Sequence, residues 1–542
     1  MEPILLYDTT LRDGTQGENI TFTAPEKIKI AERLDDLGID FIEGGWPGSN
    51  PRDMQFFDLA RRIRLRHARL AAFGATRKPG IDPADDASIK ALIECGTPAV
   101  TLFGKSWIMH VERIMNTSRQ ENLDMIRETV AYMKHKGREV IYDAEHFYDG
   151  YLQHSAYALQ TLQAAVDGGA DYIVLCDTNG GTLPRDIETM TRAAAEALAS
   201  GGPCPVPLGI HAHNDCALGV ANSIAAVEAG ASMVQGTING YGERCGNADL
   251  TALLPVLVLK MKRACAAAAH LKKLRSVSRF VSETANLVPR NNRPFVGRSA
   301  FAHKGGVHVH AIMKTPAAYE HMDPERVGNS RRVLVSDLSG RSNVEYKARE
   351  LGVTLGANDW DSRRIVQHIK QLEQEGYQFD VADGSLKILL QKFADQFTPL
   401  FELDSFRVTV EKDKDKPCAA HATIKIAVDN RREITAAEGY GPVSALDNAL
   451  RKALGKFYPD LDTMRLVDFK VRVIDGRDGT AAKVRVLIES RDQDQIWSTI
   501  GVSDDIIEAS WQALADSFQY KLAKEQRTLP QSAAVARRAS AS

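Results

Sequence analysis

Two short polar stretches, about 200 residues apart, carry side chains that could share one metal ion. The first is Asp8–Gly14, which reads Asp-Thr-Thr-Leu-Arg-Asp-Gly, and the second is His211–Asp215, which reads His-Ala-His-Asn-Asp. Side chains alternate along a strand, so a His-x-His pair on a strand points both imidazoles to the same face. Two imidazoles and a carboxylate suit a divalent cation and leave coordination positions open for a substrate. Such a cation can polarise a carbonyl group that lies next to a carboxylate.

The elements that must position these residues are short apolar runs that alternate with helix-period segments over the first 260 or so residues. Runs rich in Val, Ile and Leu, each followed by a helix, are typical of buried parallel strands. The runs are Ile4–Tyr7, Phe41–Trp46, Leu70–Gly74, Ala99–Phe103, Val140–Tyr142, Tyr172–Cys176, Leu208–Ile210 and Met233–Thr237. Eight βα units predict a (β/α)₈ TIM barrel. A doubly wound open sheet is the alternative.

The barrel prediction requires chemistry at the carboxyl ends of the strands. Polar side chains do lie in or just after seven of the eight runs. They are Asp8, Arg12, Asp13, Glu43, Lys105, Asp143, Glu145, Asp177, Thr178, His211, His213 and Asn239. Solubility alone does not explain so regular a placement.

After the predicted barrel, the pattern of apolar and polar residues changes twice along the chain. Residues 266–396 are predicted to be mostly helical, with helices over Ala266–Leu287 and Arg363–Glu375, whereas Phe301–Gly340 is predicted to be loop-like. From about residue 403, apolar and polar residues alternate, and two groups of such strands are each followed by a helix. The helices are expected over Val443–Phe457 and Asp504–Leu522.

We therefore expect four regions. They are a barrel over 1–265, helical accessory subdomains over 266–396, an α+β regulatory (dimerisation) domain with an internal repeat over 397–526, and a disordered tail over 527–542.

Composition excludes several classes of protein. The 542 residues are 44% hydrophobic and 25% charged with a net charge of −2, so no basic field favours nucleic acid or an anionic membrane. No apolar run approaches the roughly 20 residues of a membrane span, and the first strand begins too early for a signal peptide. Seven cysteines without a C-x-x-C pair fit a reducing, cytoplasmic location.

Two further segments could be functional. Gly240–Asn247 is similar to a dinucleotide-binding fingerprint, but it has Cys245 where the third glycine belongs and follows the last barrel strand, so a NAD site is not expected. A role in binding CoA or phosphate stays open. His303, His308 and His310 lie close together outside the barrel, which also suggests function.

Several motifs in order resemble the acyltransferases of the isopropylmalate, homocitrate and citramalate synthase family, which share their barrel with hydroxymethylglutaryl-CoA lyase. The resemblance covers residues 1 to about 525, and its C-terminal part is similar to the family's regulatory dimerisation domain. The motifs are Asp8–Gly14, His211–Asp215, Asn239–Asn247, Phe301–His308, Tyr319–Glu325 and Ser339–Asn343. Tyr142–Gly150 and Gln235–Asn247 look like the citramalate synthase branch.

The resemblance implies roles for individual residues. The ligands of a divalent metal (Mn²⁺, Mg²⁺ or Zn²⁺) would be Asp13, His211, His213 and Asn247. Arg12 would stabilise an enolate or alkoxide. Arg12, Glu43, Thr178 and Glu145 would bind the substrate, and Glu145 could also assist proton transfer. His308 and Tyr319 would assist catalysis from the partner subunit.

The resemblance also implies a reaction: acetyl-CoA condenses with a 2-oxo acid, pyruvate being favoured, to give (R)-citramalate and CoA on a route to 2-oxobutanoate and isoleucine. A homodimer with exchanged accessory domains and an amino-acid feedback inhibitor are expected. Alternatives are a lyase, a 2-isopropylmalate or homocitrate synthase, a non-catalytic amino-acid sensor, and an amidohydrolase-type enzyme. Two features depart from the family pattern: His310 replaces an aspartate, and Asp143 replaces an aromatic residue of some pyruvate-specific relatives.

Overall fold

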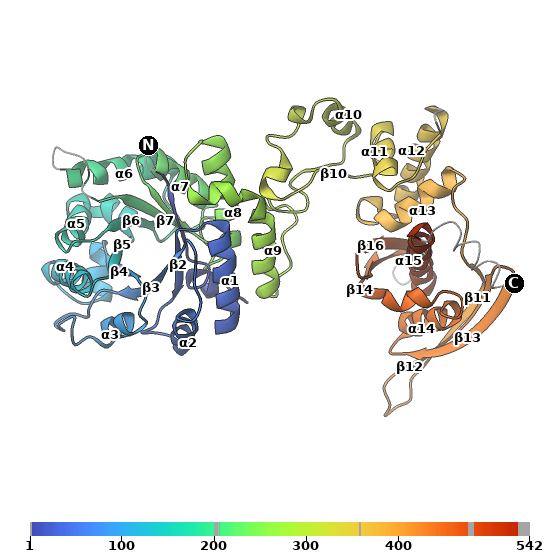
Figure 1. Cartoon of the computed structure of the whole chain (residues 1–542), viewed down its shortest axis with the longest axis horizontal. Helices are drawn as coiled ribbons and strands as arrows, with labels where there is room; N and C mark the ends of the chain where they lie inside the picture. Colours follow the sequence, from blue (N-terminus) through green and yellow to red (C-terminus); the bar gives the residue numbers. More distant parts are fainter. Residues whose placement is uncertain (1–2, 200–203, 205, 357–358, 475–481, 529–542) are drawn as a thin grey trace. The chain divides into compact units, whose positions relative to one another are not determined.

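The computed structural model describes residues 3–199, 204, 206–356, 359–474 and 482–528. The chain divides into two compact units. The first consists of Met1–Phe301 and Met322–Ser330, and the second of Ala302–His321 and Arg331–Ser542. Figure 1 labels their helices and strands.

The first unit is a closed barrel of eight parallel strands in sequential order, so the predicted TIM barrel is confirmed and the open sheet is not. The strands are β1 (Leu5–Asp8), β2 (Phe41–Gly45), β3 (Arg69–Ala75), β4 (Ala99–Lys105), β5 (Glu139–Glu145), β6 (Tyr172–Asp177), β7 (Leu208–Ala212) and β8 (Met233–Gly236). Each predicted run became a strand. Four strands, β1, β4, β5 and β6, extend past the predicted runs and contain residues expected to follow them, namely Asp8, Lys105, Asp143, Glu145 and Asp177.

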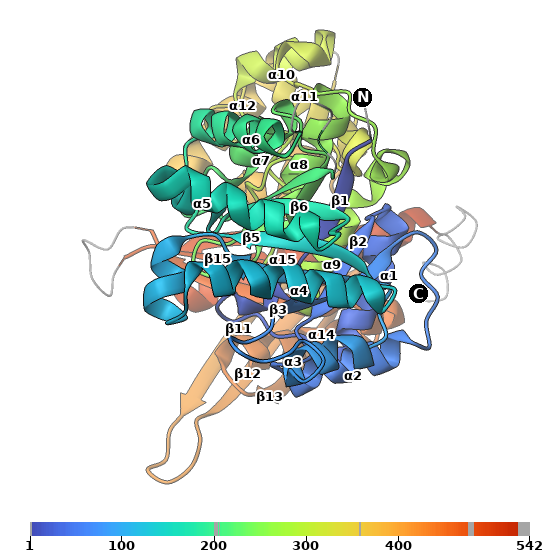
Figure 2. The same cartoon turned by 90° about the vertical axis from the view of Figure 1, so that its left-hand side faces the viewer.

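Helices surround the barrel (Figures 1 and 2). They are α1 (Ala24–Leu37), α2 (Pro51–Ala60), α3 (Ala87–Glu94), α4 (Arg119–His135), α5 (Phe147–Asp167), α6 (Pro184–Ala199), α7 (Gly219–Glu228), α8 (Leu250–Pro255) and α9 (Leu274–Thr284). Short 3₁₀ or π turns are η1 (Asp13–Gln16), η2 (His110–Ile114), η3 (Ile238–Gly240), η4 (Val256–Lys260), η5 (Ala266–Lys273) and η7 (Pro324–Val327).

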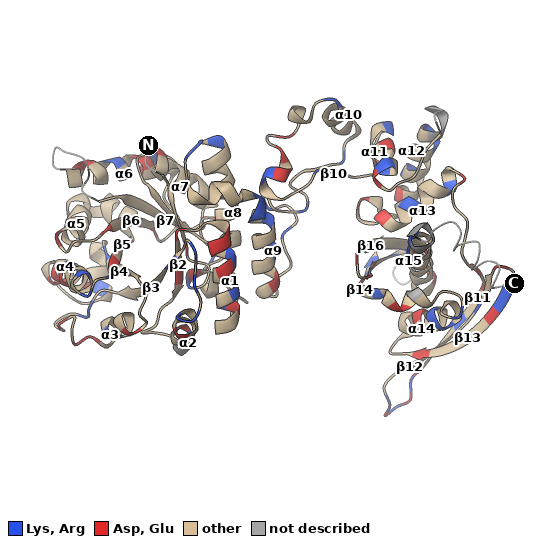
Figure 3. Ribbon diagram, viewed as in Figure 1, with Lys and Arg blue, Asp and Glu red and all other residues tan. Residues whose placement is uncertain are grey.

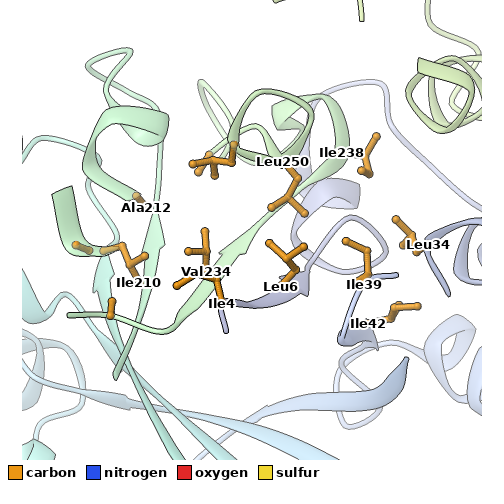
Figure 4. Close-up of a cluster of buried hydrophobic side chains, with 14 of the residues drawn as sticks. Ile4, Leu6, Leu34, Ile39, Ile42, Ile210, Ala212, Val234, Ile238 and Leu250 are labelled. Atoms are coloured by element: carbon orange, nitrogen blue, oxygen red, sulfur yellow. The ribbon is translucent and has the colours of Figure 1, made fainter. Parts of the chain in front are cut away.

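The strict alternation of side chains decides which residues face the barrel interior. Ile4, directly before β1, and Leu6, on β1, pack outward in the cluster that includes Leu34 of α1 (Figure 4), whereas Tyr7 of β1 belongs to the interior cluster. On β7, Ile210 and Ala212 pack outward, so His211 and the following His213 face the interior. The outward cluster anchors the strands against the helices and thereby fixes the inward residues.

The helix predicted over Ala266–Leu287 was wrong as a single element, because it consists of the 3₁₀ segment η5 followed by α9. Its buried positions Leu271, Leu274 and Val277 lie three residues apart. Such spacing fits a 3₁₀ helix as well as an α-helix, so periodicity does not distinguish them.

The second unit begins with a parallel pair of short strands, β9 (Ala302–His303) and β10 (Arg332–Val333). Its helices before the C-terminal repeat are α10 (Gly306–Lys314), α11 (Arg341–Glu350), α12 (Asp359–Gln374) and α13 (Asp383–Phe393), with 3₁₀ turns η6 (Pro316–Ala318) and η8 (Phe379–Val381). The expectation of a loop throughout Phe301–Gly340 was wrong, because α10 lies within it. Only Val309 and Ile312 of α10 are buried, and two glycines at its start obscure the helical pattern.

The same order of elements then occurs twice. The first half has β11 (Glu402–Glu411), β12 (Ala419–Val428), β13 (Arg431–Gly439) and α14 (Pro442–Leu454). The second has η9 (Pro459–Thr463), β14 (Arg465–Val473), β15 (Val484–Arg491), β16 (Ile496–Ser503) and α15 (Ile506–Thr528). Each sheet is antiparallel and packs one face on its helix, as the alternating pattern predicts.

Of the predicted tail, residues 529–542 lie outside the described part of the chain. Basic and acidic side chains are interspersed along the helices of both units (Figure 3). Among the described residues, no helix combines the length and apolar character that a membrane crossing requires.

Candidate active site and metal centre

Asp13, His211 and His213 lie together at the carboxyl end of the barrel. Asp13 begins η1 after β1, His211 lies on β7, and His213 follows β7 directly. His211 Nε2 is 3.4 Å from Asp13 Oδ2 and 3.4 Å from His213 Nε2, and candidate ligand atoms of all three lie within 4.8 Å of one another. These separations suit atoms that share one cation at about 2.1 Å.

Unpaired polar atoms indicate that this cluster fits a divalent cation. Among the described residues, Asp13 Oδ1 and Asn247 Oδ1 are buried and have no hydrogen-bond partner. Asn247 forms a β-bridge with His213, and its Nδ2 donates to Tyr241 O at 3.1 Å, which leaves its oxygen free. Buried acceptors without partners are costly, and carboxylate, amide and imidazole groups are suitable metal ligands.

Burial and neighbouring charges favour the metal-binding protonation states of Asp13 and His213, whereas contact with the Asp13 carboxylate raises the pKa of His211 against the effect of its burial. Burial would raise the pKa of Asp13, but the positive charge of Arg12 and the contact with His211 hold this pKa well below its usual range. Burial, reinforced by His211, lowers the pKa of His213 to about 4. Asp13 is therefore a carboxylate and His213 a neutral imidazole at neutral pH, which are the forms that bind metals.

Arg12 is held from three sides at the edge of this cluster. Its Nε donates to Glu43 Oε1 at 2.5 Å, its Nη1 lies 3.3 Å from Asp13 Oδ2, and its guanidinium carbon lies 3.7 Å from the centre of the Phe73 ring. Glu43 is fully buried, does not line the cavity, and accepts from Tyr7 Oη at 2.7 Å with its other oxygen. The structure thus places Glu43 behind Arg12, as a support for the guanidinium.

A cavity of about 180 Å³ opens beside the cluster. Trp46, Phe73 and Phe103 form an aromatic wall, with Trp46 edge-on to the other two rings at 5.4–5.6 Å. The other residues that line the cavity are mostly polar: Arg12, Asp13, Gln16, Asp143, Glu145, Cys176, Thr178, His211, His213, Glu243 and Arg244.

Thr178 and Glu145 both line this cavity. Thr178 Oγ1 accepts a hydrogen bond from the backbone N–H of His146 at 2.9 Å. His146 has a left-handed backbone with φ +58°, a strained conformation for this residue type that is held next to the cavity. Glu145 forms an ion pair with Lys105 of the neighbouring strand β4.

His308 and Tyr319 belong to the second unit. Their rings stack 4.0 Å apart with an angle of 20° between the planes. The two residues are thus in contact with each other, and their participation in the barrel site stays a prediction.

Sequence reasoning overlooked the aromatic wall and Gln235, which is buried beside His211. Phe73 and Phe103 lie on β3 and β4 at positions that alternate with outward-packed residues. Extending the inward-facing alternation along each predicted strand would have identified them.

Three family models match the chain in succession. Residues 3–281 match the HMGL-like family, residues 295–377 the homocitrate synthase post-HMGL domain-like family, and residues 380–522 the LeuA allosteric (dimerisation) domain.

Curated relatives match over nearly the whole chain. The chain is 50% identical to an (R)-citramalate synthase of Geobacter sulfurreducens over 97% of this chain and 99% of that protein. It is 49% identical to an (R)-citramalate synthase of Aquifex aeolicus with the same coverage. It is 30% identical to a 2-isopropylmalate synthase of Methanocaldococcus jannaschii over 97% of this chain and 96% of that protein. The chain therefore belongs to the HMGL-like family and, within it, to the group of the (R)-citramalate synthases.

Proposed function

We propose that the protein condenses acetyl-CoA with pyruvate to give (R)-citramalate and free CoA. The observation that carries this proposal is the identity of about half of all residues to two (R)-citramalate synthases over almost the full length, against 30% to a 2-isopropylmalate synthase. The geometry of the barrel cavity supports it, because a cationic guanidinium and a metal-binding cluster adjoin a small pocket.

The proposed metal ligands are Asp13, His211 and His213, with Asn247 as a fourth, and Mn²⁺, Mg²⁺ and Zn²⁺ are the candidate ions. When bound, such a cation would supply Lewis acidity for a 2-oxo acid.

The chain's own groups would bind the 2-oxo acid and stabilise charge. The Arg12 guanidinium, fixed by Glu43 and Phe73, would donate to the oxygen on which negative charge develops. Thr178 accepts from the His146 N–H, so its hydroxyl hydrogen is available to donate to the substrate carboxylate. The aromatic wall would exclude water from this side of the pocket.

Proton transfer completes the proposed reaction. A base removes a methyl proton from acetyl-CoA, the resulting carbon nucleophile attacks the keto carbon of pyruvate, and the alkoxide that forms takes up a proton. Water then cleaves the thioester, which gives the second carboxyl group and free CoA. Glu145, which faces the cavity beside Lys105, is a candidate for moving protons, as are His308 and Tyr319 of the second unit.

The aromatic wall is consistent with the choice of pyruvate, because we expect the methyl group of pyruvate to face Trp46, Phe73 and Phe103, where a branched chain would need more room. The match to the LeuA allosteric (dimerisation) model supports oligomerisation. A homodimer with exchanged accessory segments, a role in isoleucine synthesis and inhibition by an amino acid are part of the same proposal.

A panel of 2-oxo acids tests the activity. Acetyl-CoA is supplied with pyruvate, 2-oxobutanoate, 2-oxoisovalerate or 2-oxoglutarate, CoA release is followed with a thiol reagent, and the product is identified by mass spectrometry. Pyruvate should give the highest kcat/KM.

Arg12→Ala should lower kcat about 10²- to 10³-fold, because one oxyanion-stabilising group contributes about 3–4 kcal/mol. Arg33→Ala, on the outside of α1, is the matched control.

Preference for 2-oxoisovalerate or 2-oxoglutarate would instead identify a 2-isopropylmalate or homocitrate synthase. Failure to release CoA with any 2-oxo acid in the presence of Mn²⁺, Mg²⁺ or Zn²⁺ would favour a non-catalytic sensor.

A further inference from the structure

Gln235 is a buried amide that joins a candidate metal ligand to a carboxylate on the far side of the barrel interior. It lies on β8 directly in register with His211 on β7, and its side chain is fully buried. His211 Nδ1 and Gln235 Oε1 are 2.8 Å apart. Gln235 Nε2 donates to Asp143 Oδ1, on β5, at 2.9 Å.

The two ends of this chain of hydrogen bonds are not equivalent. The amide group of Gln235 has a donating nitrogen and an accepting oxygen. The ionised carboxylate of Asp143 only accepts, so it holds the amide nitrogen on its own side and turns the oxygen toward His211. An oxygen only accepts, so His211 Nδ1 must carry the hydrogen.

A hydrogen on Nδ1 leaves Nε2 of the neutral imidazole with its lone pair. This Nε2 is the atom that lies 3.4 Å from both Asp13 Oδ2 and His213 Nε2. If the amide were reversed, its nitrogen would donate to Nδ1, and the hydrogen of neutral His211 would sit on Nε2, where it would have to be displaced before a cation could bind. A partner that fixes the tautomer of a metal-binding histidine typically changes metal affinity 10- to 100-fold.

We propose that Gln235 and Asp143 are positioning residues that fix His211 as the Nδ1–H tautomer and orient its Nε2 for cation binding. Asp143 would not touch the cation, because Gln235 and His211 lie between them. This inference rests on the proposed metal site and deepens it. Its readout is metal affinity, which is measured without turnover, so its failure is distinguishable from failure of the proposed reaction.

Four variants separate orientation of the amide from packing. Gln235→Met removes the acceptor and should weaken Mn²⁺ binding at least 10-fold. Asp143→Leu removes the group that orients the amide and should weaken binding about 10-fold. Asp143→Asn offers Gln235 both an acceptor and a donor and so no longer fixes the amide, and affinity should fall between those of the wild type and Asp143→Leu.

The decisive variant is the double substitution Asp143→Leu/Gln235→Glu. A carboxylate at position 235 accepts from His211 Nδ1 in either orientation, so it no longer needs Asp143. We expect the double variant to recover wild-type affinity to within about threefold. Mn²⁺ affinity is measured by calorimetry on the full-length protein, and the thermal unfolding midpoint establishes that each variant is folded. Gln519→Met, a buried glutamine in the second unit, is the matched control and should leave affinity unchanged.

Two results would overturn the proposal. They are wild-type affinity in Gln235→Met and a folded double variant that binds no better than Asp143→Leu. The second result would assign the effect of Asp143 to packing.

Discussion

At the scale of single residues, the site consists of a few side chains that are each fixed by others. Arg12 illustrates this, because a fully buried carboxylate and a phenyl ring hold its guanidinium in one orientation. Glu43 was expected to contact substrate, but both of its oxygens are bonded to protein groups, Arg12 and Tyr7. A preorganised guanidinium needs no reorganisation when charge develops beside it, which is the basis of its proposed role.

Adding a metal ion to the metal-free protein tests the proposed metal ligands at this scale. Adding Mn²⁺ at about 100 times its Kd to the metal-free protein should raise the free energy of unfolding of the barrel by about 2.7 kcal/mol, because the ion binds the folded state alone. Urea denaturation with and without the ion measures this gain. Asp13→Asn should lose most of it, since one carboxylate ligand is removed.

Asp58→Asn, at an exposed aspartate on α2, serves as the control and should keep the full gain. A wild-type protein whose stability does not respond to millimolar Mn²⁺, Mg²⁺ or Zn²⁺ would contradict the assignment of Asp13, His211 and His213 as ligands.

At the scale of elements, the connection between β2 and α2 shapes the aromatic wall. Lys27 Nζ, on α1, donates to Gly44 O at 3.0 Å and to Asp53 at 2.6 Å, and Asp53 accepts from the Trp46 backbone N–H at 2.8 Å. Gly45 has φ +154°, and a Cβ there would lie 2.3 Å from Asp53 Cγ. A buried ion pair and a glycine therefore hold the backbone that presents Trp46 to the cavity.

Substitution of this pair should separate stability from substrate binding. Asp53→Asn leaves the buried charge of Lys27 without an opposite charge and should lower the free energy of unfolding by about 3–5 kcal/mol, whereas Lys27→Met/Asp53→Leu should lose much less. In the double variant the Trp46 N–H has no acceptor, so KM for pyruvate should rise although stability recovers. Urea denaturation and steady-state kinetics measure the two effects.

The exposed ion pair between Glu188 and Arg192 on α6 provides a comparison, and Glu188→Gln should change stability by less than about 1 kcal/mol. An unchanged KM in the Lys27→Met/Asp53→Leu variant would show that the pair does not position Trp46.

At the scale of the whole molecule, the chain distributes its candidate catalytic residues over two units. Asp13 belongs to the barrel, whereas His308 lies on α10 of the second unit. If His308 acts on the barrel of a partner subunit, Asp13→Asn and His308→Ala should complement each other, because a mixed dimer contains one intact site.

Co-expression of the two inactive variants should then restore about a quarter of the wild-type activity, since half of the dimers are mixed and each has one working site of two. Each variant expressed alone is the control. Activity that stays at the level of the single variants would place His308 in the site of its own chain or outside the reaction.

The sequence by itself determined the barrel and the candidate metal-binding cluster. Strand periodicity and the His211-x-His213 spacing are local signals, so every apolar run predicted the position of a strand and the two imidazoles were correctly expected on one face. The alternating strands and two helices of the C-terminal repeat were predictable for the same reason.

Only the tertiary structure decided which side chains complete the site. Gln235 meets Asp143, 92 positions away in the chain, and Trp46, directly after β2, meets Phe103 on β4. These contacts arise because barrel closure brings the inward residues of distant strands to one axis, and no local pattern encodes which of them will touch. The helix α10 was missed because it buries only two apolar side chains, too few to give a periodic signal, while its packing within the second unit stabilises it.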